Sequence, residues 1–263
     1  MRTYEALSAA YFLVLAVAGL FAPVDKPRRA VGCLCALAAV VLVSIASTTG
    51  GVVRDWAPLV YIAAGYWIPS LFVSGVAAHL VVERWLLRTD TSLRHWLPPI
   101  PARTVPVFEV AYLACYFLVP IGFLLVFIAG SPDDVNRFWT AVLTSGYVCY
   151  GTLPWLQSRP PRVLAPFGCA QGKPHTPPSI AHVNVFVLSR ISHGWNTFPS
   201  GHAAMSFAVA FALAPVSVPA AIAAAIVATG VAIGAAAGRY HFAVDVILGS
   251  LVAMVSGGVV FGF

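Results

Sequence analysis

Charged side chains are scarce along the whole chain. Asp, Glu, Lys and Arg make up 9% of the 263 residues, whereas hydrophobic residues make up 60%. A soluble domain typically carries about 25% charged residues. Because no segment long enough for a soluble domain remains once the apolar runs are removed, the composition excludes a soluble globular protein. It predicts a polytopic membrane protein.

The chain also lacks paired cysteines and internal repeats. Its five cysteines are Cys33, Cys35, Cys115, Cys149 and Cys169. Four of them lie in apolar runs, where cysteine behaves as a small hydrophobic residue. The Cys33-Leu34-Cys35 step does not have the spacing of a metal site. These observations favour a structural role for all five.

Acidic residues are fewer than basic ones, at 9 against 15, which gives a net charge of +6. The basic residues lie in loops between apolar runs, and no basic face interleaved with aromatic residues is present. The positive charge therefore favours anionic lipid headgroups over nucleic acid as partners.

Apolar segments of membrane-spanning length recur from one end of the chain to the other. A spanning helix needs about 20 mostly apolar residues. Eight segments meet or nearly meet this length: 7–24, 31–48, 57–82, 107–130, 138–156, 199–214, 216–238 and 242–263. We therefore predict an all-α, polytopic membrane helical bundle of about eight spans, within a range of six to eight. Glu109, near the start of the fourth segment, is either buried and paired or at the interface.

We divide the chain into an N-terminal membrane hairpin, residues 1–56, and a membrane catalytic domain, residues 57–263. The Ala-, Val- and Arg-rich composition is typical of a high-GC bacterium, and together with the apolar segments it leads us to expect a multi-pass protein of the bacterial cell (inner) membrane. Whether the chain forms a homo-oligomer is left open.

Only two charged residues, Arg239 and Asp245, follow residue 190. An ionisable residue within the membrane is a functional-site hypothesis by default. Because His241 and Asp245 are four apart, they share one helical face. The carboxylate can orient the imidazole and leave its other nitrogen as a nucleophile, and Arg239 can bind phosphate oxygens. A buried His–Asp pair that only stabilises the bundle would not explain why Arg239 and His202 join it.

The second motif is Pro199-Ser200-Gly201-His202. Proline and serine are favoured at helix starts, and the free backbone N–H groups there bind anions. We expect the Ser200 and Gly201 amides to bind an oxyanion beside His202. The alternative is a plain helix cap with an incidental histidine.

The first motif in chain order is Ser158-Arg159-Pro160-Pro161-Arg162, a basic and stiff segment, and the third is the segment from Arg239 to Asp245. By itself it would be read as an interfacial anchor after a span. With eight spans, however, this segment, the start of the sixth span and the turn before the eighth all lie on one side. We therefore expect Arg159 to converge with His202, Arg239 and His241.

In their order along the chain, Arg-Pro, Pro-Ser-Gly-His and Arg-x-His-x-x-x-Asp resemble the type 2 phosphatidic acid phosphatase superfamily, over roughly residues 107–263. Two departures stand out. Thr152 occupies the position where the first motif usually has lysine, so Arg162 is a candidate substitute. Arg239 lies two residues before His241 instead of six. This short spacing is more similar to the branch of inositol phosphorylceramide and sphingomyelin synthases.

The resemblance implies a six-helix catalytic core and a phosphoric ester hydrolase or related lipid phosphotransferase that needs no metal or other cofactor. His241 would be the nucleophile that forms a phosphohistidine, Asp245 would orient it, and His202 would be the general acid. Phosphate would be bound by the remaining site residues, Arg159, Arg162, Ser200, Gly201 and Arg239.

Several functions remain open at this stage. We favour a lipid phosphatase that hydrolyses a lipid phosphate or diphosphate, since water is always available as acceptor. The first alternative is a transferase that moves a phospho-headgroup to an acceptor hydroxyl. A non-enzymatic transporter with a proton path is less favoured, because transporters often show inverted repeats and this chain has none. A haloperoxidase is also less favoured, because those enzymes are usually soluble.

Overall fold

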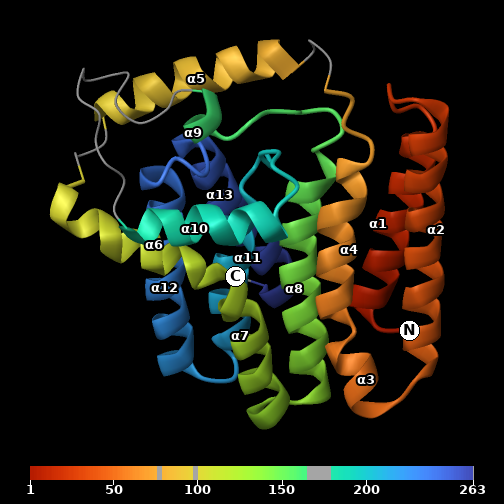
Figure 1. Ribbon diagram of the computed structural model, residues 1–263. Helices are drawn as coiled ribbons and strands as arrows, with labels where there is room; N and C mark the ends of the chain where they lie inside the picture. Colours follow the sequence, from red (N-terminus) through yellow and green to blue (C-terminus); the bar gives the residue numbers. More distant parts are fainter. Residues whose placement is uncertain (76–78, 97–99, 165–178, 263) are drawn as a thin grey trace.

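The computed structural model describes residues 1–75, 79–96, 100–164 and 179–262, which form helices joined by turns (Figure 1). The α-helices are α1 (Thr3–Gly19), α2 (Lys26–Thr48), α3 (Gly51–Trp56), α4 (Pro58–Ser70), α5 (His79–Trp96), α6 (Val105–Leu113), α7 (Cys115–Ala129), α8 (Pro132–Gly151), α9 (Pro161–Leu164), α10 (Ser179–Ile191), α11 (Gly201–Leu213), α12 (Val218–Ala237) and α13 (Ala243–Phe261), with a 3₁₀ turn at Ala102–Thr104. Within these ranges there is no β-strand, only an isolated bridge between Ser158 and Asn196. The prediction of an all-α fold is confirmed for this part of the chain.

Three of the described helices, α2, α12 and α13, are long and apolar enough to cross a membrane. The adjoining helices α6 and α7 would add a fourth span if they are counted as one helix bent by 51°. Helices α1 and α11 are apolar but shorter. These lengths support an integral membrane protein, while the count of about eight spans stays a prediction.

Polar caps and prolines fix the starts of several helices. At α8, the Ser131 hydroxyl accepts from the Asp134 N–H at 3.2 Å, and the Asp134 carboxylate accepts from the Ser131 N–H at 2.8 Å. Pro132 takes the first helical position, where its missing N–H costs nothing. At α12, Ser217 accepts from the Ala220 N–H, one residue after Pro219. These starts are therefore encoded locally.

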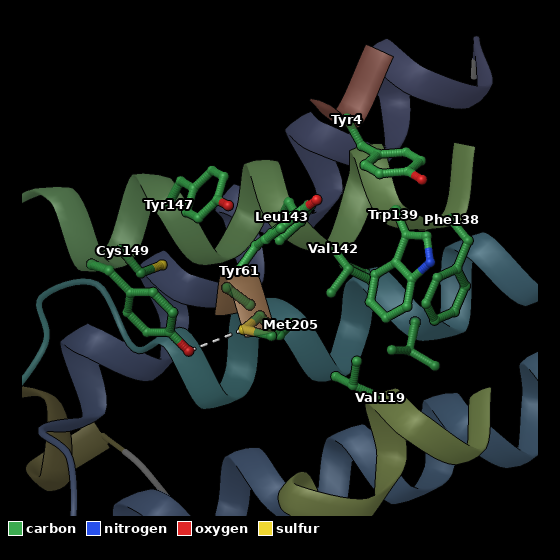
Figure 2. Close-up of a cluster of buried hydrophobic side chains, with 14 of the residues drawn as sticks. Tyr4, Tyr61, Val119, Phe138, Trp139, Val142, Leu143, Tyr147, Cys149 and Met205 are labelled. Carbon is green, nitrogen blue, oxygen red and sulfur yellow. Dashed lines mark hydrogen bonds between the residues drawn. The ribbon is translucent and has the colours of Figure 1, made fainter. Parts of the chain in front are cut away.

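Helix α8 lies at the centre of the bundle and packs against α1, α4, α11 and α13. The fully buried Phe138 and Trp139 meet edge to face, with ring centroids 5.0 Å apart, in the cluster shown in Figure 2. Further along α8, Tyr147 stacks on Tyr11 of α1 at 4.0 Å. Because lipid is as apolar as these side chains, close packing rather than expulsion from water stabilises this interior. The contact of α1 with α8 ties the N-terminal hairpin to the rest; the domain boundary at 56/57 stays a prediction.

Two segments differ from their expected form. The third apolar segment, 57–82, is helical to Ser70 in α4, and its last residues belong to α5. Helix α5 is amphipathic, because Glu83, Leu86 and Asp90 recur at helical spacing and are all buried. The segment between the fifth and sixth apolar segments, which the eight-span prediction leaves as a loop, contains α10, whose apolar residues also recur at helical spacing. In Figure 1, α5 and α9 lie at the top of the view and α3 lies at the bottom.

Candidate active site

The three motifs meet at the end of the bundle where α5 and α9 lie (Figure 1). The segments before α9 and before α11 are joined by the Ser158–Asn196 bridge, in which the Asn196 N–H donates to the Ser158 carbonyl at 2.8 Å. The segment before α11 is also joined to α13, because the Ser200 N–H donates to the Asp245 carbonyl at 3.0 Å. Backbone hydrogen bonds therefore hold all three motifs together.

His202 and His241 face each other directly. Nδ1 of His202 lies 3.2 Å from Nε2 of His241, within hydrogen-bond distance. His202 is in the first turn of α11, and His241 is a buried residue in the turn before α13. The structure thus brings together two residues that are 39 positions apart in the sequence.

Asp245 lies behind His241 and is fully buried. Its Oδ2 accepts hydrogen bonds from Asn196 Nδ2 at 2.7 Å and from the Phe242 N–H at 3.2 Å. Nδ1 of His241 is 3.5 Å from the same oxygen, slightly beyond a good N–H···O hydrogen bond. Catalytic hydrogen bonds are often long without substrate and tighten when it binds. Asp245 is therefore placed to orient the Nδ1–H tautomer of His241, which leaves Nε2 free to react.

His241 favours its neutral form. Burial and, after it, the positive charge of Arg162 lower the pKa of this imidazole to about 3, from an ordinary value of 6.5. A neutral imidazole with Nδ1 protonated has a lone pair on Nε2, so it can act as a nucleophile. The Nδ1–H of His202 would then be the donor in the contact between the two rings.

Arg162 is the arginine that faces this pair. It lines a small polar cavity together with both histidines. Its guanidinium lies over the Tyr240 ring, 4.7 Å from the centroid, and its Nη1 is buried with no hydrogen-bond partner among the described residues. A buried guanidinium donor without a partner suits an anionic oxygen. Among the three motif arginines, Arg162 is therefore the one whose guanidinium can meet an anion in this cavity.

A buried glutamate holds the ring beneath Arg162. The Tyr240 hydroxyl donates to Oε2 of Glu109 at 2.6 Å, and the Asn184 amide donates both to that carboxylate and to the Glu109 carbonyl. Tyr112 stacks on Tyr240 with centroids 4.4 Å apart. Of the two alternatives for Glu109, the structure shows the buried and paired one. Sequence reasoning missed the role of Tyr240, although its position between Arg239 and His241 was a signal.

The other two arginines of the motifs do not line the cavity. Arg159 pairs with Glu83 of α5, with Nε–Oε1 and Nη2–Oε2 distances of 2.9 Å each. Arg239 adopts a left-handed backbone conformation with φ of 58°, and its carbonyl accepts from the Arg162 N–H at 3.1 Å. Their assignment to phosphate stays a prediction.

The Pro-Ser-Gly-His segment caps α11 as expected. The Ser200 hydroxyl accepts from the Ala203 N–H, and the Gly201 N–H lies 3.4 Å from the Thr197 hydroxyl. A side chain at Gly201 would collide with the Tyr150 ring, since a Cβ there would lie 2.5 Å from it. Binding of an oxyanion by the two amides stays a prediction, because the Ser200 N–H already donates to Asp245. Thr152, at the usual lysine position, donates to the Phe198 carbonyl at 2.5 Å.

Two cavities meet at His202. The polar cavity has a volume of about 20 Å³, little more than one water molecule needs. The apolar cavity, of about 370 Å³, is lined by residues of α4, α7, α8, α10 and α11. Tyr66 and His202 line both. A phosphate cannot enter the polar cavity unless the histidine rings separate, whereas the apolar cavity is already large enough for part of a hydrocarbon chain.

Residues 135–263 match the family model of the PAP2 superfamily. The matched region starts within α8 and contains all three motifs, so it includes His202, His241 and Asp245. The match supports a phosphatase-type enzyme of lipid metabolism. It does not distinguish the branch of inositol phosphorylceramide and sphingomyelin synthases from the rest of the PAP2 superfamily. Searches of curated proteins and of solved structures each gave no match.

Among the described residues, no three His, Cys, Asp or Glu side chains lie close enough together to bind a metal ion. His175 and Cys169 lie outside the described residues. The PAP2 region thus offers two histidines, an aspartate and an arginine in contact range, which suit nucleophilic and acid–base chemistry at phosphorus.

Proposed function

We propose that the protein is an integral-membrane lipid phosphatase that hydrolyses a lipid phosphate or diphosphate through a phosphohistidine, without a metal. The observation that carries the proposal is the contact between His202 and His241 beside the buried Nη1 of Arg162, at the junction of a polar and an apolar cavity. The PAP2 match over residues 135–263 supports the same class of reaction.

The proposed arrangement in the membrane has eight spans in a multi-pass protein of the bacterial cell (inner) membrane. The spans are α1, α2, α4, the bent pair α6–α7, α8, α11, α12 and α13. In this arrangement residues 1–56 contribute the N-terminal hairpin and residues 57–263 the catalytic domain. Large apolar side chains on the outer faces, such as Ile128, Ile226 and Val259, would then contact lipid.

The first proposed step is the attack of His241 Nε2 on phosphorus. The phosphate displaces the contact between the two rings and places its oxygens against Arg162. The bond from phosphorus to the lipid oxygen breaks while the new P–N bond forms. In this step the negative charge of the bound phosphate favours the cationic, doubly protonated form of His202, which passes its Nδ1 proton to the leaving oxygen and becomes neutral, a general acid step worth typically about 10²–10⁴-fold.

In the second step, water attacks the phosphohistidine. His202 is now a neutral ring, and its unprotonated Nδ1 takes a proton from the water. The P–N bond breaks, and phosphate leaves. Asp245 holds the Nδ1–H of His241 in both steps, while Arg162 stabilises the charge on the equatorial oxygens. The roles proposed for Arg159, Arg239 and the Ser200 and Gly201 amides require these groups to turn toward the phosphate when it binds.

The apolar cavity favours a lipid substrate over a soluble phosphate ester. It lies beside His202, the residue that protonates the leaving group, and its lining includes Leu59, Ile62 and Val119. An apolar leaving group would therefore enter this space while its phosphate faces His241.

The alternative is a phospho-headgroup transferase of the inositol phosphorylceramide or sphingomyelin synthase type, which would use the same residues. The two-residue spacing between Arg239 and His241 favours it. The difference lies in the acceptor, because a hydroxyl-bearing lipid or polyol would replace water in the second step.

The test uses purified protein in detergent with EDTA. Phosphatidic acid, a polyprenyl diphosphate and a phosphoinositide are each supplied with and without an alcohol acceptor. We expect phosphate release without acceptor that is lost in His241→Ala and retained in His95→Asn, since His95 is an exposed histidine of α5. Acid-labile phosphate trapped on His241 would establish the intermediate.

Other outcomes decide against the proposal. Product formed only when the acceptor is present would place the protein among the transferases. Full turnover by His241→Ala would show that the nucleophile is misassigned. Failure to trap phosphohistidine with any phosphorylated lipid, together with no turnover, would favour the transporter.

A further inference from the structure

Helix α5 presents two buried carboxylates to the rest of the protein. Glu83 is 3% exposed and Asp90 is 4% exposed, whereas Arg84 and Arg88 lie on the opposite, outer face. A buried carboxylate destabilises the fold unless it is paired or hydrogen-bonded. Both carboxylates have partners outside α5 in segments that carry motifs of the site.

Glu83 binds the segment of the first motif. Besides its two contacts with the Arg159 guanidinium, its Oε1 accepts from the Arg159 backbone N–H at 2.9 Å. Arg159 is three residues before Arg162, with two prolines between them. Because prolines fix their φ angles, a constraint on Arg159 also limits where Arg162 can lie.

Asp90 binds the segment of the third motif. Its Oδ1 accepts from the N–H of Ala243, the first residue of α13, at 2.7 Å. Its Oδ2 accepts from Arg94 Nε at 2.6 Å, and Arg94 Nη2 donates to the Ala236 carbonyl near the end of α12 at 2.9 Å. The turn that carries His241 is therefore anchored to α5 on both sides.

The second motif is contacted as well. The ring of Trp85 meets the ring of Phe198 edge to face at 5.7 Å, and Phe198 immediately precedes the Pro-Ser-Gly-His segment. Helix α5 thus touches all three motifs, although it lies between residues 79 and 96, outside the region matched by the superfamily.

We propose that α5 is a positioning element of the active site, in which Glu83 sets the place of the phosphate-binding segment and Asp90 sets the place of His241. This inference rests on the proposed function for its catalytic readout. Neither carboxylate touches the reacting atoms; each acts through the backbone and side chains that it holds. A misplacement of about 1 Å at a reacting group can cost about 10²-fold in rate, so such support has a measurable effect.

Asp90 is tested with two substitutions. Asp90→Ala leaves the Ala243 N–H without its partner and lets the turn of His241 shift, so we expect kcat to fall by about 10²-fold with KM within about threefold. Asp90→Asn keeps an oxygen that can accept from Ala243, and we expect it to restore most of kcat. An Asn variant as slow as the Ala variant would overturn the role of Asp90 as a backbone anchor.

Glu83 is tested in the same way, with a different expected signature. Glu83→Ala releases Arg159 and loosens the segment of Arg162, so we expect KM to rise by about tenfold with a smaller change in kcat. Glu83→Gln keeps an oxygen that can accept from Arg159, so its KM should lie between those of the wild type and Glu83→Ala. Orthovanadate affinity, measured by thermal shift, should fall in Glu83→Ala in parallel with the rise in KM.

The matched control is Glu5→Gln. Glu5 forms a similar buried pair with Arg54, far from the histidines in the sequence and in the fold. We expect kcat and KM of this variant, measured on the monodisperse fraction, to equal those of the wild type. Equal loss of stability in Glu5 and α5 variants with no change in kcat, KM or vanadate affinity would show that α5 is only structural. A wild type that neither turns over phosphorylated lipids nor binds vanadate would instead overturn the proposed function.

Discussion

Two buried glutamate–arginine pairs hold different ends of the bundle with nearly the same geometry. Glu5 binds Arg54 through two side-chain contacts of 2.6 and 2.8 Å and accepts from the Arg2 N–H at 2.6 Å. Glu83 binds Arg159 through two contacts of 2.9 Å and accepts from the Arg159 N–H. Each carboxylate is almost fully buried, and each arginine is partly exposed.

The difference between the pairs lies in what they hold. Glu5 joins α1 to α3, at the end where Trp139 Nε1 donates to the Asp55 carbonyl and the core is aromatic. Glu83 joins α5 to the segment that leads to Arg162 and the histidines. The same chemistry therefore serves packing at one end and, as we propose, positioning at the other. The local geometry of an ion pair does not reveal which role it has.

The largest expected effect is a loss of activity at the site end that leaves the fold intact. His241→Ala removes the proposed nucleophile, so kcat should fall by at least about 10⁴-fold, as when a member of a catalytic triad is removed. The folded protein should be retained, because alanine leaves only a small cavity beside Asp245. Phosphate release and size-exclusion behaviour are the two measurements. Substantial residual activity that copurifies with the variant would contradict the assignment.

Within the site end, the two arginines of the first motif should differ in how much each contributes to kcat/KM. Arg162→Lys replaces a planar fork with a point charge beneath the phosphate, and we expect kcat/KM to fall by about 10²-fold. Arg159→Lys can still pair with Glu83 through one contact and should cost about tenfold or less. Steady-state kinetics of both variants decide the order. A larger loss in Arg159→Lys would mean that Arg159 turns to the phosphate during turnover.

At the other end, loss of the buried carboxylate should affect stability alone. Glu5→Ala leaves Arg54 and the Arg2 N–H without their acceptor, which we expect to cost about 1–3 kcal/mol. Thermal unfolding in detergent measures this loss. The kcat of the protein that remains folded should equal that of the wild type; a lower value would show that the two ends are coupled through α8.

The smallest expected effect is a pH dependence confined to the site end. Burial, and then the charge of nearby His202, lower the pKa of His193 to about 4 from an ordinary value of 6.5. His193 Nδ1 accepts from the Trp195 N–H, which requires the neutral ring. Since the unfolded chain binds the proton more readily, the stabilisation by neutral His193 is present above about pH 6.5 and is lost as the pH falls toward 4.

Melting temperatures measured between pH 7.5 and 5 test this expectation. His193→Gln should lose less stability than the wild type over that range, because an amide does not titrate there. The pKa of His241 is lowered as well, so its titration contributes to the dependence of melting temperature on pH in both proteins. A variant with the full slope of the wild type would show that His193 does not contribute.

The helical class and the meeting of the motifs were predictable from the sequence. Apolar runs predict helices because their length matches a bilayer, and the four-residue spacing of His241 and Asp245 places them on one face. The contact of these residues with His202 depends on the order of the last three helices, and the expected convergence of the histidines is what the structure shows.

The partners of the arginines were not predictable. From the sequence, Arg159 and Arg162 are both assigned to phosphate, and each borders a proline. What separates them is Glu83, 76 residues upstream, in a helix that was expected to be partly the end of a span. An amphipathic helix with two carboxylates on its buried face can be recognised from its spacing, but the groups that it binds depend on tertiary structure. The same holds for Glu109, whose partners lie on α10 and in the turn after α12.

The meeting of the two cavities at His202 has a consequence for the fate of the products. A lipid alcohol released into the apolar cavity stays with the bilayer, whereas phosphate released from the polar side dissolves in water. The two products of the proposed reaction thus part into different phases at a single side chain. Their recombination would require both to return to the same histidine from opposite surroundings, so the rate of the reverse reaction should depend on how much lipid alcohol the membrane holds.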